Sequence, residues 1–356
     1  MFKIRMLCIG LGMMACLMGP DALAGSGLCP GSIVVVDTVT KRVLQIDQID
    51  GTQTTISSGG SFISLFGVAV ESSGDLVVVD RAAFSDTTGA GGVLRIDPLT
   101  GLQTPILIRD GLIASMGLVL GPAGEILVSN FFGDDVISID PTTGAHTSLT
   151  ADGFLAGPMG MALRSDGELF IADNDGSSIV QANITTGVQT QVTINGLLQG
   201  PSDIAIEDSG MLVVADFNSG RIVRVNPDTG QQSLVTSGFN LPYGITVEAD
   251  GNLLVTDHTT FFPQMGRIVR VNPGTGSKTV LSTDGFLGFP AGIITIPYSP
   301  ADFNHNGAVD ILDLISLINA FGPCAGCPED FVPPGGDGDV SITDLIALIN
   351  AFGPCP

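Results

Sequence analysis

The sequence contains no tryptophan, only 2 tyrosines and only 3 histidines. Carbohydrate sites commonly stack sugar rings on tryptophan or tyrosine, and Tyr243 and Tyr298 are the only such side chains here. Histidine is the most frequent general acid or base in enzymes. Since His146, His258 and His305 are scattered along the chain, the sequence offers no evident nucleophile–base pair.

Basic residues are also scarce. The 13 lysines and arginines face 36 aspartates and glutamates, and the formal net charge is −23. A chain this acidic repels phosphate backbones and anionic lipid surfaces, which argues against nucleic acid and acidic membranes as partners. The surplus of carboxylates suits a solvated surface together with cation sites.

The sequence has one notable apolar run, residues 6–18, which follows Lys3 and Arg5 and is too short for a stable membrane span. Ala22 and Ala24 then supply the small residues of a signal-peptidase site. This pattern predicts a signal peptide over residues 1–24 and export to the periplasm, the cell surface or the medium. We expect no membrane span elsewhere.

Cysteine is scarce too: 2 of the 6 residues fall in the predicted signal peptide, which leaves Cys29, Cys324, Cys327 and Cys355. An even number of cysteines in an exported chain favours disulfides, and four cysteines allow three pairings. Zinc bound at Cys324 and Cys327 is the competing interpretation, but no second CxxC and no nearby histidine pair accompany them.

Glycine, by contrast, is abundant, with 48 residues that punctuate a repeated pattern. Each repeat has an apolar run, a polar loop, an alternating apolar run and a turn, as in residues 210–235. The apolar runs end at Asp37, Asp80, Asn130, Asp173, Asp216 and Asp257. The turn glycines are Gly51, Gly101, Gly144, Gly187, Gly230 and Gly276. Roughly 40–50 residues with about four strands is the period of a propeller blade.

The first repeat lacks the strand with which the complete repeats begin. That strand follows a glycine in residues 160–163 and 244–247, whereas residues 31–37 start in the middle of a repeat. The missing strand is found at the far end, in residues 292–296. We therefore expect the last strand to complete the first blade and close a ring of six, which removes free sheet edges.

Residues 241–245, 250–257 and 267–271 together resemble an NHL-type repeat. That family forms six-bladed β-propellers related in shape to the gluconolactonase propellers. The resemblance covers about residues 31–298 and implies an all-β six-bladed propeller as the domain of residues 25–298. It is nearly silent on function, because propellers serve many functions.

The lactonase-type relatives hold Ca²⁺ with a Glu, Asn and Asp cluster where the inner strands begin. The positions that match here are Phe66, Met116, Met159, Ser202–Asp203, Tyr243 and Ala291. One carboxylate cannot supply the six or more oxygens that Ca²⁺ takes, so we predict no catalytic residues. Asp203, Tyr243 and His258 are the candidates for ligand contact on the propeller face.

Two further features concern loops. Residues 81–92 and 258–266 form long loops that we expect on one face. Their length indicates either a binding surface or sequence drift without function, which exposed loops tolerate. The segments between repeats carry apolar residues that we expect to be wedges between blades. These are Phe154–Leu155, Leu197–Leu198, Phe239 and Phe286–Leu287.

The tail contains an EF-hand-like loop that starts at Asp302 and has Gly307 at its sixth position. Its predicted calcium ligands are Asp302, Asn304, Asn306, the carbonyl of Ala308, Asp310 and Asp313. An apolar stripe then predicts a helix over residues 313–321. This loop predicts one firm Ca²⁺ site.

A second loop–helix unit follows, because residues 344–355 nearly repeat residues 313–324. Its weaker predicted site comprises Asp330, Asp337, Asp339, Ser341 and Asp344. Two such units resemble a type I dockerin module, here residues 299–356. The resemblance implies a small α-helical calcium-binding module with a protein partner of the cohesin kind. The pairs Ile311–Leu312 and Ile342–Thr343 depart from the Ser-Thr pairs that often contact cohesin.

These patterns favour an exported, non-catalytic binding or scaffold propeller, attached to a partner or surface through its calcium-dependent tail. The ligand of the propeller face is not specified by the sequence. The alternative is a propeller enzyme, such as a lactonase, a lyase or a glycan-active hydrolase, carried on a dockerin-like module for polysaccharide breakdown. A metal or a carboxylate–histidine cluster in the central channel would distinguish the two.

Overall fold

A computed structural model describes residues 28, 31–81, 90–150, 153–193, 195–258, 266–297, 311–320, 322–323, 339–341 and 344–346. The predicted signal peptide and the four candidate disulfide cysteines lie outside these residues and stay predictions. The chain divides into two compact units, one of which is Gly31–Pro297. The other contains the described residues of the tail, and each unit is taken by itself below.

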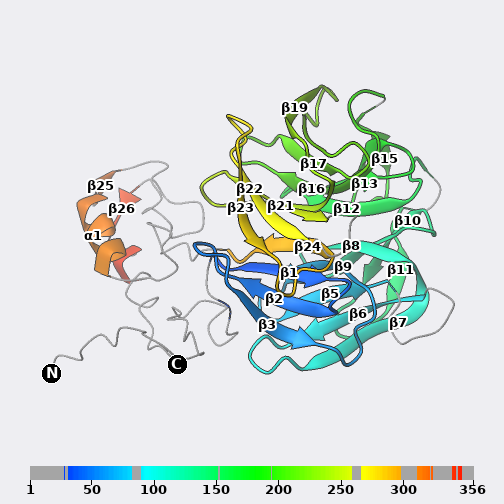
Figure 1. Cartoon of the computed structure of the whole chain (residues 1–356), viewed down its shortest axis with the longest axis horizontal. Helices are drawn as coiled ribbons and strands as arrows, with labels where there is room; N and C mark the ends of the chain where they lie inside the picture. The colour runs from blue at the N-terminus through cyan, green and yellow to red at the C-terminus, as the bar shows by residue number, and fades with distance from the viewer. Residues whose placement is uncertain are drawn as a thin grey trace. The chain divides into compact units, whose positions relative to one another are not determined.

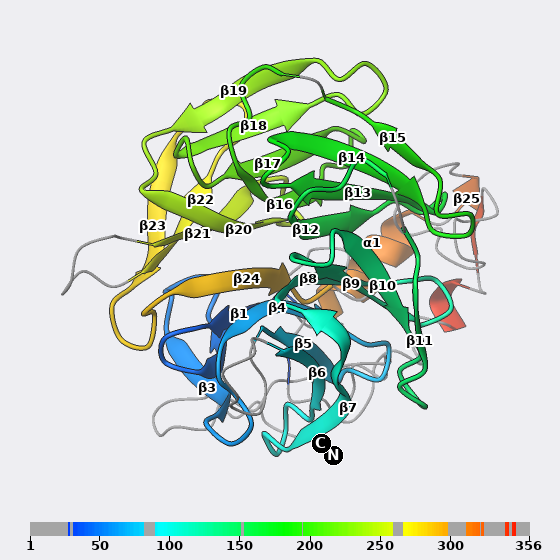
Figure 2. The ribbon, with the colours of Figure 1, turned by 90° about the vertical axis from the view of Figure 1, so that its right-hand side faces the viewer.

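The unit Gly31–Pro297 consists of six four-stranded antiparallel sheets that follow one another around a ring (Figure 1, Figure 2). From the channel outwards, blade 1 contains β24 (Pro290–Thr295), β1 (Ile33–Asp37), β2 (Arg42–Ile46) and β3 (Gln53–Ser58). Blade 2 contains β4 (Leu65–Val70), β5 (Leu76–Asp80), β6 (Ala90–Ile96) and β7 (Gln103–Ile113). Blade 3 contains β8 (Ser115–Leu120), β9 (Ile126–Asn130), β10 (Asp135–Ile139) and β11 (His146–Ser148).

The remaining blades repeat this order. Blade 4 contains β12 (Pro158–Leu163), β13 (Glu168–Asp173), β14 (Ser178–Asn183) and β15 (Gln189–Gln191). Blade 5 contains β16 (Pro201–Ile206), β17 (Leu212–Asp216), β18 (Arg221–Val225) and β19 (Gln232–Ser237). Blade 6 contains β20 (Leu241–Val247), β21 (Leu253–His258), β22 (Arg267–Val271) and β23 (Lys278–Thr283).

The ring closes as the sequence predicted. The last strand, β24, pairs antiparallel with β1, with Ile33 opposite Thr295 and Val35 opposite Ile293. The gold β24 lies beside the blue β1 in both views (Figure 1, Figure 2). The first blade is therefore built from both ends of the ring, and β1 is not left with an unpaired edge.

The core lies between the blades. The second strand of a blade is apolar and buried on both faces, as in β1 and β17, because it is covered by the neighbouring blade on each side. Between blades 4 and 5, for example, Phe170 and Ile179 share a cluster with Leu212. Each such buried side chain contributes roughly 1.5–3 kcal/mol to the burial term.

A buried acid or amide ends each second strand and holds the segment that leads into an inner strand. The Asp216 carboxylate accepts the backbone N–H groups of Gln199 (2.7 Å) and Gly200 (3.0 Å). Asp80, Asn130, Asp173 and Asp257 do the same in their blades. These recurrent residues thus satisfy backbone donors in the linkers, which fixes where each inner strand begins.

The tail unit contains α1 (Ile311–Ala320), which starts two residues before the predicted helix, and helical residues 344–346. A two-residue ladder pairs β25 (Gly322–Pro323) with β26 (Asp339–Val340). Only part of the predicted apolar stripe of α1 is buried: Leu317 is covered, whereas Ile315 and Ile318 are exposed. No helix in the described parts of the chain has the length and apolar character needed to cross a bilayer.

Candidate functional site

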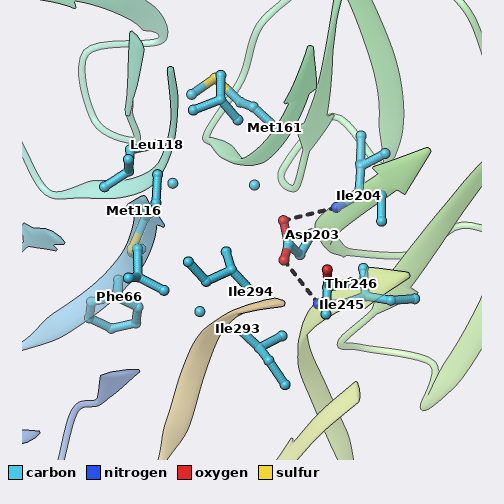
Figure 3. Close-up of a pocket in the computed structure, with 18 of the residues that line it drawn as sticks. Phe66, Met116, Leu118, Met161, Asp203, Ile204, Ile245, Thr246, Ile293 and Ile294 are labelled. Carbon is cyan, nitrogen blue, oxygen red and sulfur yellow. Dashed lines mark hydrogen bonds between the residues drawn. The ribbon is translucent and has the colours of Figure 1, made fainter. Parts of the chain in front are cut away.

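The six inner strands surround a central cavity of about 350 Å³. Every inner strand contributes apolar residues to its wall (Figure 3). The polar residues of the wall are Ser202, Asp203, Tyr243, Thr246 and Thr295. The Ser202 hydroxyl lies 2.8 Å from the carbonyl oxygen of Tyr243 and is engaged there. Asp203 is therefore the one carboxylate in a largely apolar wall.

Asp203 occupies a position that is glycine in the other five inner strands. The equivalent residues are Gly67, Gly117, Gly160, Gly244 and Gly292. A Cβ atom on Gly117 would lie 2.5 Å from the carbonyl oxygen of Met159, and one on Gly244 would lie 2.3 Å from that of Ala291. The inner strands thus approach too closely for a side chain.

The missing side chain of Gly160 provides the room for the Asp203 carboxylate. A Cβ atom built on Gly160 would lie 2.0 Å from Oδ1 of Asp203. Oδ1 accepts the backbone N–H of Ile204 (2.9 Å), and Oδ2 accepts that of Ile245 (3.0 Å) on the next blade (Figure 3). Asp203 therefore joins β16 to β20 at the channel wall.

The electrostatic environment of Asp203 disfavours its ionised form. Burial in the apolar channel raises its pKa to about 7, although the two backbone N–H groups act in the opposite direction. Tyr243 is the other titratable residue of the wall, and burial raises its pKa well above the usual value. Tyr243 stays protonated at neutral pH, whereas Asp203 is divided between its two forms.

Large side chains close the channel at the end where the inner strands begin. Phe66, Met116, Met159 and Tyr243 are all buried there. The Tyr243 ring lies 5.6 Å from that of Phe66, and its hydroxyl is 3.7 Å from the sulfur of Met116. The positions that hold Ca²⁺ in lactonase-type propellers are thus filled with a packed apolar plug.

His258 lies on the outer side of this plug, at the end of β21. Its ring is 4.4 Å from that of Phe289, which in turn is 5.6 Å from Tyr243. Its Nδ1 is buried and has no hydrogen-bond partner, and burial lowers the pKa of the imidazole. The preceding residue, Asp257, is engaged by Arg267 at 2.6 Å. The structure therefore brings Asp203 and Tyr243 to one cavity and leaves His258 outside it.

Five exposed apolar residues lie at the face where the inner strands begin, which is the closed end of the channel, and the sequence had not indicated their exposure. They are Val39, Ile113, Phe132, Phe154 and Phe286, which follow second strands or precede inner strands. Phe154 and Phe286 had been expected as wedges between blades, but they are 51% and 38% exposed. In each pair the following leucine, Leu155 or Leu287, is the buried wedge. One residue of the pair faces the core, so its neighbour faces solvent.

In the tail, the structure describes only some of the predicted calcium ligands. Asp313 and Asp344 are fully buried, and Asp344 accepts the backbone N–H (3.0 Å) and the hydroxyl (3.3 Å) of Ser341. Outside the described residues or side chains lie Asp302, Asn304, Asn306, Ala308, Asp310, Asp330, Asp337 and the side chain of Asp339. Among described residues, no three His, Cys, Asp or Glu side chains gather to hold a metal ion. Both calcium sites stay predictions.

Comparison with known proteins supports the fold alone. No family model and no curated protein matches the chain. A chain in the crystal structure of a nidogen/laminin complex is 16% identical with a TM-score of 0.62, covering 74% of this chain and 97% of that one. A streptogramin B lyase is 17% identical with a TM-score of 0.55, covering 74% and 87%. Virginiamycin B lyase from Staphylococcus aureus is 17% identical with a TM-score of 0.50, covering 64% and 73%. All are similar to this chain in their β-propeller fold.

Proposed function

We propose that this protein is an exported binding or scaffold propeller. Its closed face contacts another protein, and its tail attaches it to a partner or surface in a calcium-dependent way. The observation that carries the proposal is the apolar face around the plugged end of the channel. The plug blocks entry of a small substrate at this end, whereas the exposed aromatic side chains can contact the surface of another protein.

The composition of the closed face supports a macromolecular partner. Phe132 is 62% exposed, and its ring packs against Phe131 at 5.1 Å, with the Arg81 guanidinium 5.8 Å from its centroid. Exposed aromatic residues and arginine are enriched in protein interfaces. Val39, Phe154 and Phe286 extend the apolar surface over other blades. The nidogen/laminin neighbour comes from a complex of two proteins, which is consistent with such a role on this fold.

The tail offers a second apolar surface. Ile315 and Ile318 on α1 are 48% and 54% exposed, and Ile346 takes in the second repeat the place that Ile315 has in the first. Exposed apolar residues on two repeated short helices suit a protein partner of the cohesin kind. Because short helices are marginal alone, we expect bound Ca²⁺ in the predicted first loop to fold this surface.

The test is capture of partners from the envelope and secreted fractions by the full chain, with Ca²⁺ or with a chelator. A face variant combines Phe132→Ser and Phe286→Ser. The control is Leu234→Ser on the outer strand β19, where the exposure of Leu234 (53%) lies between those of Phe132 (62%) and Phe286 (38%). We expect some partners to be captured by the control but not by the face variant, and others to be released by the chelator. If the wild type, the face variant and the control captured the same set of partners, the proposal would be contradicted.

An enzyme of the lyase or lactonase type is the second candidate, and His258 favours it. Burial lowers the pKa of the imidazole, which keeps it neutral at pH 7 as a general base requires, and its buried Nδ1 has no hydrogen-bond partner within the protein. Streptogramin B lyase shares the fold. The test is turnover of lactones, cyclic peptide esters and glycans. Activity that His258→Ala or Asp203→Ala abolishes would replace the binding proposal.

A further inference from the structure

The Asp203 carboxylate is not needed to build the ring. Five of the six inner strands have glycine at this position, and each packs against the next strand without a side chain. Asp203 does span two blades, since it accepts the N–H of Ile245 at 3.0 Å. The ionised form of Asp203 places a charge in an apolar wall, where an unpaired carboxylate is energetically unfavourable. Such a residue is explained better by what it can bind than by what it packs against.

No cation in the wall neutralises this carboxylate. The residues that line the cavity include no lysine, arginine or histidine. Both hydrogen bonds to Asp203 come from backbone N–H groups of the wall, and Figure 3 shows the carboxylate at the edge of the open space. Its other lone pairs are therefore available to a positively charged donor in the cavity.

The rest of the cavity is suited to an apolar body. Val68, Leu118, Met161, Ile204 and Ile293 line it, and the flexible thioether of methionine adapts to ligands of different shape. A volume of about 350 Å³ lies within the range of small-molecule sites. One end is closed by Phe66 and Tyr243, while the lining continues to Val70, Leu120 and Pro297 at the other. A ligand therefore enters from the face at which the inner strands end.

We propose that the central channel binds a small apolar molecule that carries one ammonium group, with the ammonium on the Asp203 carboxylate and the apolar chain along the channel. The proposal is independent of any partner on the closed face. It also requires no metal, because a lone carboxylate satisfies an ammonium ion but not Ca²⁺.

The experiment is calorimetric titration of the full chain at pH 8 and constant ionic strength with hexylammonium chloride. At this pH the alkylamine is protonated, as a lysine side chain is, and Asp203 is largely ionised. The uncharged comparison ligand is 1-hexanol, which has the same alkyl chain. We expect the ammonium ion to bind at least tenfold more tightly than the alcohol. Lengthening the chain from butyl to hexyl should tighten binding about threefold to fourfold per methylene.

The variants separate the carboxylate from the cavity. Asp203→Gly places the residue of the other five strands in the ring, and Asp203→Asn keeps the size of the side chain without its charge. Both should weaken hexylammonium binding at least tenfold and leave that of hexanol nearly unchanged. The control Asp250→Asn removes a carboxylate from an exposed turn outside the cavity and should change ammonium binding less than threefold.

Four outcomes would overturn the proposal. The first three are unchanged ammonium binding in the Asp203→Asn variant, equal affinity of the wild type for ammonium and alcohol, and no binding of either probe. Binding that does not depend on chain length would also overturn it, since that would indicate ion pairing at the surface. Circular dichroism checks the fold of each variant, and either substitution at Asp203 suffices for the test.

Discussion

The two ends of the central channel are built from the same six strands, but different interactions shape them. Where the inner strands begin, Phe66, Met116, Met159 and Tyr243 close the channel by apolar packing. Where the inner strands end, ion pairs lie within single blades instead: Arg224 binds Glu207, and Arg95 and Arg270 bind Glu71 and Glu248. Arg95 and Arg270 also reach carbonyl oxygens in the turn of the next blade.

The two ends illustrate two kinds of residue: those that recur in the blades and build the ring, and those that are found in only some blades. The glycines of the inner strands, and the buried Asp or Asn residues of the second strands that hold the linkers, recur because the closed ring needs them. The plug residues, Asp203 and the exposed aromatic residues, by contrast, do not recur in all six blades. A binding role should therefore depend on the irregular positions, and stability should depend on the regular ones.

The largest expected effect comes from opening the ring, which would destroy both ends of the channel. Deleting residues 292–296 removes most of β24 and exposes the edge of β1, which is apolar and fully buried. We expect loss of the monomer through aggregation, because an unpaired apolar edge recruits other chains. Size-exclusion chromatography with light scattering measures this. A monomeric deletion variant of unchanged melting temperature would show that closure is dispensable.

A smaller effect should follow from adding a side chain where the strands touch. In Gly117→Val, the new Cβ atom would meet the carbonyl oxygen of Met159 at 2.5 Å, so the blades must separate. We expect a loss of about 3 kcal/mol in the free energy of unfolding, at the upper end of overpacking effects. Urea denaturation measures it. The control is Gly274→Ala in an exposed turn, where the added carbon meets no atom closer than 3.4 Å; equal losses in both would refute close packing as the cause.

Asp203→Asn should alter the pH dependence of stability. The folded-state pKa of Asp203, about 7, lies above its unfolded value of 3.8, so folding disfavours the ionised form. The penalty is absent below pH 3.8, grows between pH 4 and 7, and is fully present above pH 7. The variant lacks it, so its stability relative to wild type should rise by about 2 kcal/mol from pH 4 to pH 8, with allowance for partial solvent screening.

Urea denaturation of both proteins across this pH range provides the measurement. Asp173, whose pKa burial raises to about 6, titrates in both proteins, and its contribution cancels in the difference. A difference in unfolding free energy that stays constant with pH would show that the carboxyl of Asp203 is not perturbed by the channel.

The smallest effect is expected at the ion pairs of the other end. Glu207→Gln removes the charge that two guanidinium nitrogens of Arg224 contact at 2.6 and 2.7 Å. Because Arg224 is partly exposed, we expect a loss of about 1 kcal/mol or less, reduced further at high salt. Thermal unfolding at two salt concentrations measures it. A loss that is larger at high salt would contradict an electrostatic origin.

Much of the fold could be predicted from residue patterns. The spacing of turn glycines and of the acids from Asp37 to Asp257 indicated six blades, and the missing first strand indicated closure by residues 292–296; the pairing of β24 with β1 confirms this closure. The Asp and Asn residues that open the turns, such as Asp97 and Asn226, accept backbone N–H groups within their own turns. Local patterns suffice here because each blade repeats the same short-range geometry.

The candidate site could be predicted only in part. Asp203 was identified as the one acidic residue among the inner strand starts, but its place over Gly160 and its bond to Ile245 involve three different blades. The exposure of Phe154 and Phe286 could not be read from their apolar character, because adjacent linker residues differ in which of them faces the core. The calcium ligands of the tail remain predictions from loop spacing.

The sequence by itself determined the number of blades, the order of their strands and the closure of the ring, since these depend on periodic hydrophobicity, turn chemistry and strand count along the chain. Only the tertiary structure decided which side chains meet in the channel. The plug forms from blades 2, 3, 4 and 6, and the Asp203 pKa depends on walls contributed by all six inner strands. Burial and desolvation are properties of this assembled enclosure, because no single blade excludes water from its own inner edge.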